Sequence, residues 1–278
     1  MKQIFDNLSQ EMSRVTTQRY STSFSMGIRF LNKDLHKPIY SIYGFVRFAD
    51  EIVDTFHGFD KERLLADFKN QTYTAIENGI SLNPILNSFQ WVVNKYDIPL
   101  ELIETFLNSM EMDLDKNSYD KSGYEKYILG SAEVVGLMCL KVFVEGDTTE
   151  YERLKPFAMK LGSAFQKINF LRDLKADYND LGRTYFPGID LNEFNGGVKK
   201  EIEADIEIDF NIGYEGIKQL PKKARFGVYV AYIYYYKLFK KIKSVPSEEV
   251  LSGRIRIPNN KKLRILLSSY LRHNLNLL

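Results

Sequence analysis

Acidic side chains interrupt an otherwise apolar segment at residues 45–56, FVRFADEIVDTF. Asp50 and Asp54 are four residues apart and so share one face of a helix, which Arg47 joins from three residues upstream. Two carboxylates at this spacing repel each other, whereas a divalent cation would reverse the effect. Mg²⁺ suits such oxygen ligands, because it typically takes one or two carboxylates and leaves other positions for water or substrate phosphate. The same spacing also occurs on solvated surface helices, so both interpretations stay open for this segment.

A second polar stripe lies within residues 165–187. Its members stay within an arc of about 80° on a helix, and they are Gln166, Asn169, Asp173 and Asp177. A solvated outer face is the alternative interpretation, although the same helix carries apolar residues on its other faces. If the two stripes face each other across a helical bundle, they form an acidic-walled cleft for metal ions. Arg47 and Arg172 beside the acids would then hold the phosphate oxygens of an anion.

Composition narrows the class of protein. The chain has 278 residues, and 38 Lys and Arg nearly cancel 36 Asp and Glu. The resulting net charge of +2 is too small for a general nucleic-acid binder. The single cysteine, Cys139, excludes an internal disulfide and fits a reducing compartment. There is no signal-peptide core and no apolar run of ~18 residues that could span a membrane, so we expect a soluble, cytoplasmic protein.

Helical spacing of apolar residues dominates the chain, and strand-like alternation is scarce. The pattern predicts helices over residues 2–16, 21–31, 36–57, 60–78, 83–95, 99–115, 121–145, 149–178, 197–207, 213–217, 221–243 and 260–274. The connectors between them are short, which favours one all-α domain over residues 1–278. The 18 Tyr and 19 Phe indicate either a large aromatic core or a wide apolar cavity lined by rings.

Several segments resemble, in order, the motifs of the phytoene/squalene synthases, a family of head-to-head (1′–1) prenyl transferases. They cover about residues 15–275 and are YSTSFSMGIRFL (20–31), YGFVRFADEIVD (43–54), MEMDLD (110–115), YEKYILGSAEVVGLMC (124–139), QKINFLRDLKAD (166–177) and GRTYFP (182–187). The resemblance implies an isoprenoid-synthase-type helical bundle with a central apolar cavity. Two positions depart from the family pattern: Glu51 stands where many members have Asp, and Glu133 where the central motif often has Gly.

The resemblance also implies roles for individual residues. Coordination of Mg²⁺, or of Mn²⁺ in its place, is implied for Asp50, Asp54, Asn169, Asp173 and Asp177. The implied catalytic set is the four aspartates with Tyr127. Substrate contacts are implied for Ser21, Ser23, Tyr43, Arg47, Tyr127, Gln166, Asn169, Arg172 and Tyr235, with Arg256 and Lys261 as weaker candidates.

Structural alternatives accompany these roles. Ser21 and Ser23 could cap the following helix, and Tyr235 could belong to an ordinary core. The basic segment at 254–264 could be a solvated surface or could touch anionic lipid headgroups.

The implied reaction joins two geranylgeranyl diphosphates to phytoene through a cyclopropyl diphosphate, with release of pyrophosphate, as in carotenoid biosynthesis. One alternative is a squalene or dehydrosqualene synthase that uses two farnesyl diphosphates, with NADPH needed only if the product is squalene. A helical scaffold without catalytic activity is an alternative from another class. Both acidic motifs are complete in this sequence, which argues against a scaffold that has lost its activity. The expected partners are prenyl diphosphate substrates, and no nucleic acid is expected. Because the product is so apolar, we also expect a peripheral contact with the inner membrane face. The oligomeric state cannot be inferred from the sequence.

Chain length should depend on the residues at the cavity floor, for which the candidates are Ile28 and Tyr40. An aliphatic Ile28 leaves more depth than an aromatic residue would, and this favours the C20 substrate.

Overall fold

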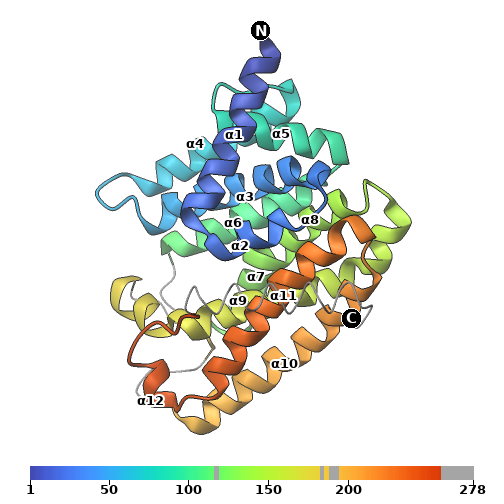
Figure 1. The fold of residues 1–278 in the computed structure, drawn as a ribbon. Helices are drawn as coiled ribbons and strands as arrows, with labels where there is room; N and C mark the ends of the chain where they lie inside the picture. The colour runs from blue at the N-terminus through green and yellow to red at the C-terminus, as the bar shows by residue number, and fades with distance from the viewer. Residues whose placement is uncertain (116–118, 182–184, 188–193, 258–278) are drawn as a thin grey trace.

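The computed structural model describes residues 1–115, 119–181, 185–187 and 194–257, apart from the side chains at 22–23, 115 and 176–181. Within these residues the fold is all-helical, as predicted, and contains no strand (Figure 1). The helices are α1 (Lys2–Tyr20), α2 (Thr22–Arg29), α3 (Lys33–Asp54), α4 (Lys61–Asn78), α5 (Pro84–Tyr96), α6 (Leu100–Asp115), α7 (Lys121–Ile128), α8 (Val134–Phe143), α9 (Thr148–Leu181), α10 (Gly196–Gln219), α11 (Lys222–Lys243) and α12 (Ser247–Val250). A π-helical turn, η1 (Leu129–Glu133), connects α7 to α8. Among these described helices, none is long and apolar enough to cross a bilayer.

Polar side chains fix where several helices begin. The side chains of Asn32 and Asp60 accept hydrogen bonds from backbone N–H groups in the first turns of α3 and α4. Asn83 does the same for α5, which places Pro84 at the first helical position, where its missing N–H costs nothing. The starts of α3, α4 and α5 that were predicted from apolar spacing lie within three residues of these capped starts.

Three predicted helices differ from the structure. The segments 197–207 and 213–217 form one continuous helix, α10, and the expected helix over 121–145 contains the π-helical turn η1. The short helix α12 was not predicted, and the expected helix over 260–274 lies outside the described residues. The break expected near Gly213 is absent because this glycine does not end the helix. Instead it faces α9, where an added Cβ would lie 3.0 Å from Cβ of Leu161.

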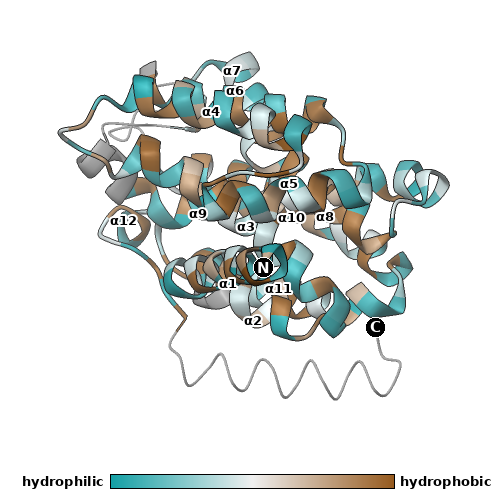
Figure 2. Ribbon diagram, turned by 90° about the horizontal axis from the view of Figure 1, so that it is seen from above, coloured by the Kyte–Doolittle hydropathy of each residue, from teal (hydrophilic) through white to brown (hydrophobic). Residues whose placement is uncertain are grey.

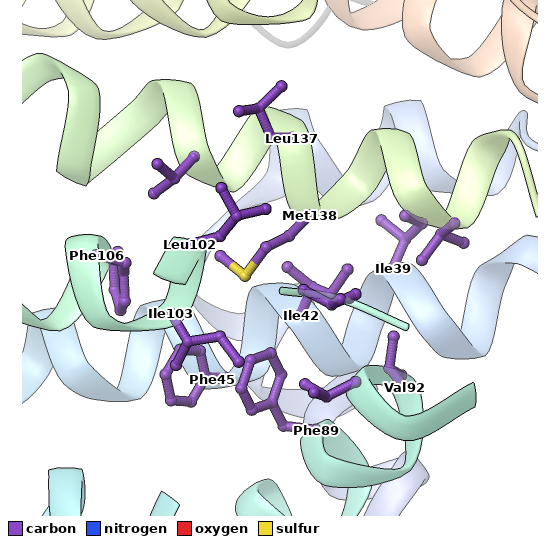
Figure 3. Close-up of a cluster of buried hydrophobic side chains, with 14 of the residues drawn as sticks. Ile39, Ile42, Phe45, Phe89, Val92, Leu102, Ile103, Phe106, Leu137 and Met138 are labelled. Atoms are coloured by element: carbon purple, nitrogen blue, oxygen red, sulfur yellow. The ribbon is translucent and has the colours of Figure 1, made fainter. Parts of the chain in front are cut away.

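The first half of the chain packs around a cluster of aromatic and branched side chains from α3, α5, α6 and α8 (Figure 3). Phe45 and Phe89 stack with ring centroids 3.8 Å apart, and Phe106 packs against Phe45 at 5.4 Å. Each of these three rings is essentially excluded from solvent. Burying such large apolar surfaces is the main favourable contribution to folding, so this cluster holds α3 rigidly beneath the site.

The second half has its own core, in which tyrosine and phenylalanine predominate. Phe210 on α10 packs edge-on against Tyr232 and stacks with Phe239, both on α11. Close backbone approach brings α10 against α9 as well: an added Cβ at Gly216 would lie 2.3 Å from Cβ of Phe157. The glycine therefore lets the two helices meet, with the Phe157 side chain packed over it.

Candidate active site

A cavity of about 750 Å³ lies between the two halves of the described chain. Its wall comes from the last residue of α1, from α2, α3, α6, α7, η1, α8, α9, α10 and α11, and from the segment 254–257. Along α9 the lining residues recur every three or four positions, from Leu154 to Arg172. At 1.5 Å per residue this wall is about 27 Å long. A cavity of this length and volume can take a long, narrow ligand.

Polarity changes along the wall in the same direction on two helices. Leu154, Phe157 and Leu161 on α9 give way to Gln166, Asn169 and Arg172. On α3, Ile39 and Ile42 give way to Arg47 and Asp50. One end of the cavity is therefore apolar, and the other end is polar and charged.

The charged end has an excess of positive charge. Among the described residues that line the cavity, the charged ones are Arg47, Arg172, Arg254, Arg256 and Asp50. Four guanidinium groups against one carboxylate favour an anion, and guanidinium geometry suits the paired oxygens of phosphate. The cavity therefore combines an anion-binding end with an apolar chamber.

Arg47 is held in place by acids of its own helix. Its Nη1 lies 2.6 Å from Oδ2 of Asp50, and it also pairs with the buried Glu51. Its guanidinium stacks over the ring of Tyr20, 4.6 Å from the centroid. These contacts aim the guanidinium at the cavity while the carboxylates compensate its charge.

A second group of charges forms around Asp173 on α9. Arg172 donates hydrogen bonds from Nε (2.9 Å) and Nη2 (2.5 Å) to the two carboxylate oxygens of Asp173. Nε of Arg254 lies 2.8 Å from the same carboxylate, although this arginine is more than 80 residues away in the sequence. Burial opposes the charge of Arg172, but the hydrogen bonds with Asp173 outweigh it and raise the pKa of this arginine above its usual range.

Between these groups lies Asn169, whose amide connects α9 to α11. Its side chain is hydrogen-bonded to Tyr235, whose pKa is raised by burial and lowered in part by the charge of Arg172. The amide oxygen of Asn169 is buried and has no hydrogen-bond partner among the described residues. The ring of Tyr235 also stacks on Phe165, with centroids 4.2 Å apart. Two aromatic faces thus border the charged end of the cavity.

Ser21 combines the two roles that the sequence left open. Its hydroxyl accepts a hydrogen bond from the backbone N–H of Phe24 at 3.2 Å and so caps α2. The same residue lines the cavity and is hydrogen-bonded to Tyr43. Burial raises the pKa of Tyr43 to about 12, against the opposing effect of that hydrogen bond. Tyr43 therefore stays neutral, as a hydrogen-bonding group, at any physiological pH.

Tyr127 lines the cavity, but its hydroxyl is already engaged by another buried residue. It donates a hydrogen bond to Oδ2 of Asp113 at 2.7 Å, and Tyr119 donates to the other oxygen at 3.3 Å. Burial, followed by the charge of Asp113, raises the pKa of Tyr127 well above its ordinary value. Asp113 lies in the MEMDLD segment but was assigned no role from the sequence.

Glu133, the departure from the family pattern, points away from the cavity. Ser163 on α9 donates a 2.5 Å hydrogen bond to it, and Glu133 is not among the lining residues. Burial raises the pKa of this carboxyl group, and the hydrogen bond from Ser163 partly offsets the effect. The residue connects η1 to α9 behind the cavity wall.

The structure brings many of the predicted residues together in this cavity. Those that line it are Ser21, Tyr43, Arg47, Asp50, Tyr127, Gln166, Asn169, Arg172, Tyr235 and Arg256, together with Ile28 from the predicted floor. Asp54 and Asp173 are not lining residues: Asp54 is the last residue of α3, and Asp173 lies beside Arg172. The side chains of Ser23 and Asp177, and all of Lys261, lie outside the described residues.

One floor residue was predicted wrongly, and one charged residue was missed. Tyr40 is buried and does not line the cavity; its ring packs edge-on against His36 instead. Arg254 was missed, although it lies two residues before Arg256 in the basic segment at 254–264. The alternation of arginine with apolar residues in GRIRIP was the available signal for an extended segment that points both arginines to one side.

Within the described residues, no three Asp, Glu, His or Cys side chains converge closely enough to hold a metal ion by themselves. The available donors nevertheless suit Mg²⁺, because carboxylates and an amide carbonyl are hard oxygen ligands. The unpartnered oxygen of Asn169 is a donor of this kind at the charged end. A cation that shares its coordination with substrate phosphates requires only one or two protein carboxylates.

Comparisons with known proteins agree with this geometry. The squalene/phytoene synthase family model matches residues 17–261. The 4,4'-diapophytoene synthase of Staphylococcus haemolyticus (strain JCSC1435) is 28% identical over 67% of this chain and 65% of its own length. The phytoene synthase of Arthrospira platensis is 25% identical over 95% of this chain and 93% of its own. The crystal structure of a dehydrosqualene synthase in complex with ligand superposes with a TM-score of 0.81, at 19% identity, over 96% of this chain and 98% of that one.

The chain belongs to the squalene/phytoene synthase family. Members of this family join prenyl diphosphates head to head, generally with Mg²⁺. The predicted family and the predicted all-α fold are confirmed.

Proposed function

We propose that this protein condenses two geranylgeranyl diphosphates head to head to form phytoene, with a cyclopropyl diphosphate as the intermediate. The observation that carries the proposal is the division of the cavity into a four-arginine end and a long apolar chamber. A prenyl diphosphate has the same division, since an anionic head is joined to an apolar chain. Membership of the family supplies the reaction type.

The arginines bind and orient the diphosphate groups in this proposal. Arg47 and Arg172 approach from α3 and α9, and Arg254 and Arg256 approach from the segment after α12. Ser21, Tyr43 and Gln166 add neutral hydrogen-bonding groups at the same end. Fixing both heads places the two C1 regions together, which removes much of the entropic barrier to a bimolecular reaction. Positive charge around the leaving group also stabilises the pyrophosphate as it departs.

Mg²⁺, with Mn²⁺ as the alternative, would be held by Asp50, Asp54, Asn169, Asp173 and Asp177. When bound, the metal neutralises charge on the leaving pyrophosphate. The unpartnered amide oxygen of Asn169 and the nearby carboxylates support this assignment.

Carbocations form after each diphosphate leaves, and the cavity wall protects them. The double bond of the second substrate attacks the first allylic cation and leaves a new cation, and loss of a proton from C1 of the first substrate then closes the cyclopropane ring. Loss of the second diphosphate opens this ring, and loss of a proton completes the triene. The faces of Phe165, Tyr235 and Tyr127 border the region where the charge develops and can stabilise it. The apolar wall keeps out water that would otherwise capture the cations.

The assignment of the C20 substrate rests on the shape of the cavity. Ile28 lines the wall without an aromatic ring, and the lined stretch of α9 extends back to Leu154. The C15 substrate is the second candidate, because one of the relatives is a diapophytoene synthase and one similar structure is a dehydrosqualene synthase. NADPH would enter only if squalene were the product.

The test is incubation of the purified protein with Mg²⁺ and either geranylgeranyl or farnesyl diphosphate, with and without NADPH, followed by mass identification of the extracted products. Phytoene from the C20 substrate supports the proposal. A C30 product would support the same mechanism and would identify farnesyl diphosphate, in place of geranylgeranyl diphosphate, as the substrate. Absence of turnover with either substrate, in protein shown to be folded by circular dichroism, would favour the scaffold alternative.

A further inference from the structure

Helix α1 buries a polar face and exposes an apolar one, which is the reverse of the usual arrangement for a helix on a protein surface. The residues it buries completely are small and polar: Ser9, Ser13 and Thr17. They face α3 and α5, where Ser13 lies 2.5 Å from the hydroxyl of Ser88. An added Cβ at Gly44 of α3 would lie 2.9 Å from Cβ of Ser13, so small residues are what permits this close packing.

The opposite face of α1 carries large apolar side chains in solvent. Ile4, Leu8, Met12 and Val15 are 68%, 52%, 44% and 40% exposed. Their spacing places them within about 80° of one another, so they form one stripe. We call these four residues the α1 stripe. Six of the eleven exposed large apolar residues in the described part of the chain fall within residues 1–20, so the stripe is a local concentration.

The helix that carries the stripe ends at the cavity. Tyr20, the last residue of α1, is 53% exposed and also lines the cavity, and Ser21 beside it is a lining residue too. The cavity wall therefore reaches the surface at the end of the helix that carries the stripe. Helices α1, α2 and α11 lie on the same side of the molecule (Figures 1 and 2), and α2 contacts both of the others.

Basic residues predominate on α11, although Lys223 and Lys243 pair with Glu145 and Glu207 of other segments. Helix α11 contains seven Lys and Arg without a single Asp or Glu, and α2 also lacks acids. A basic surface next to an apolar stripe is complementary to an anionic bilayer, which offers negative headgroups above an apolar interior.

We propose that the α1 stripe inserts into the interfacial layer of an anionic membrane, with the exposed lysines of α11 against the headgroups. A stable protein–protein interface uses about 20–30 residues on each side, whereas the stripe offers four on a single helix. A bilayer demands no such complementary shape, and an apolar helix face penetrates only about 5–10 Å into it. The docking itself does not depend on turnover. It rests on the proposed function only for its consequence, which is that an apolar product leaves the cavity mouth directly into lipid.

The first test is co-sedimentation with vesicles. Wild-type protein is compared with a variant that carries Ile4→Ser, Leu8→Ser, Met12→Ser and Val15→Ser, on phosphatidylcholine vesicles with and without phosphatidylglycerol. The matched control carries Phe59→Ser, Leu82→Ser, Leu100→Ser and Ile208→Ser, which removes four exposed apolar residues from other helices and loops. Circular dichroism and thermal melting verify that all three proteins are folded.

The expected result is binding of the wild type and the control to the anionic vesicles, weakened by salt, and binding at least tenfold weaker for the stripe variant. A tenfold loss corresponds to about 1.4 kcal/mol, less than the burial of a few methylene groups contributes. The proposal fails if the wild type does not sediment with anionic vesicles, or if the stripe variant sediments as the wild type does. Because this assay contains no substrate, its failure is separate from a failure of the proposed enzymatic activity.

A second measurement identifies other occupants of the stripe. A Met12→Cys protein carrying an environment-sensitive fluorophore should show a blue shift only when anionic vesicles are added; a label at Leu82→Cys should not. Cys139 is half-buried and lines the cavity, so mock-labelled wild type gives the background. A blue shift without vesicles at every protein concentration would mean that another part of the chain covers the stripe. One that grows with protein concentration would indicate a second copy, and either result overturns the proposal.

Discussion

Replacing Tyr127 with phenylalanine tests whether its hydroxyl serves the fold or the chemistry. The hydroxyl donates to Asp113 at 2.7 Å, and the two residues are 4% and 5% exposed. The phenylalanine ring keeps the aromatic contacts with Tyr119 and Tyr185, whose centroids lie 5.1 and 5.2 Å away. The substitution therefore removes one hydrogen bond to a buried carboxylate and almost nothing else.

The size of the effect follows from that bond. Hydrogen bonds to charged groups contribute about 1.5–3 kcal/mol to stability. With an m value of about 3 kcal/mol/M, the urea midpoint of Tyr127→Phe should fall by about 0.5–1 M. Turnover measured where both proteins are folded should change little, because a hydroxyl held by Asp113 is not the group that binds diphosphate.

Urea unfolding followed by circular dichroism, together with steady-state product formation, measures both quantities. Tyr229→Phe is the control: this tyrosine is buried, and its hydroxyl has no hydrogen bond among the described contacts, so its midpoint should move less. An unchanged midpoint combined with a loss of turnover of two orders of magnitude would refute the reasoning and make Tyr127 a catalytic residue.

Three further outcomes are expected. Asp173→Asn should bind pyrophosphate about fivefold more tightly than wild type in EDTA, because Arg172 loses a competing carboxylate worth about 1 kcal/mol. With Mg²⁺ present, the same variant should bind pyrophosphate more weakly than wild type. A calorimetric titration in which the affinity changes in the same direction under both conditions contradicts the assignment of Asp173 as a metal ligand. Gly216→Ala should lower the free energy of unfolding in urea by about 1–2 kcal/mol, since overpacking against Phe157 exceeds the ~1 kcal/mol gain in helix propensity. A variant more stable than wild type would mean that α9 shifts to accommodate the added methyl group. Burial raises the folded pKa of Glu133 above its ordinary 4.5, so the protein loses stability as the pH rises from 4.5 through that folded pKa. Glu133→Gln should therefore be more stable than wild type at pH 7 and similar to it at pH 4. A difference in unfolding free energy between the two proteins that shrinks as the pH rises would contradict a raised pKa for Glu133.

The local signals in the sequence predicted most of the fold. Capping residues such as Asn32 and Asn83 mark helix starts because their side chains satisfy backbone N–H groups that the helix leaves free. The helix break that was wrongly predicted near Gly213 arose because the structural reason for this glycine is tertiary and not local. In isolation glycine weakens a helix, but here it is required by a neighbouring helix, and such tertiary demands are invisible to local patterns.

The candidate site was predictable wherever a helical repeat placed its residues. Arg47 and Asp50 line the cavity on α3, as do Gln166, Asn169 and Arg172 on α9, because their spacing alone puts them on one face. Arg254 could not be placed in this way, since it reaches Asp173 from a segment whose path depends on how α12 packs. Tyr40 was misplaced for a related reason: helical spacing gives a residue's face but does not say which neighbour that face meets.

The acids within apolar helices raise the question of what compensates them. In this structure guanidinium groups do so: Arg47 pairs with Asp50 and Glu51, while Arg172 and Arg254 pair with Asp173. Each of these partners is also what the proposed complex needs, since arginines suit phosphate and carboxylates suit Mg²⁺. An anion arriving alone would have to displace carboxylates from arginines, and a cation alone would have to displace arginines from carboxylates. A metal diphosphate can exchange both sets of partners at once, which leaves no buried charge uncompensated, and we infer that the site therefore selects the metal-bound form of its substrate.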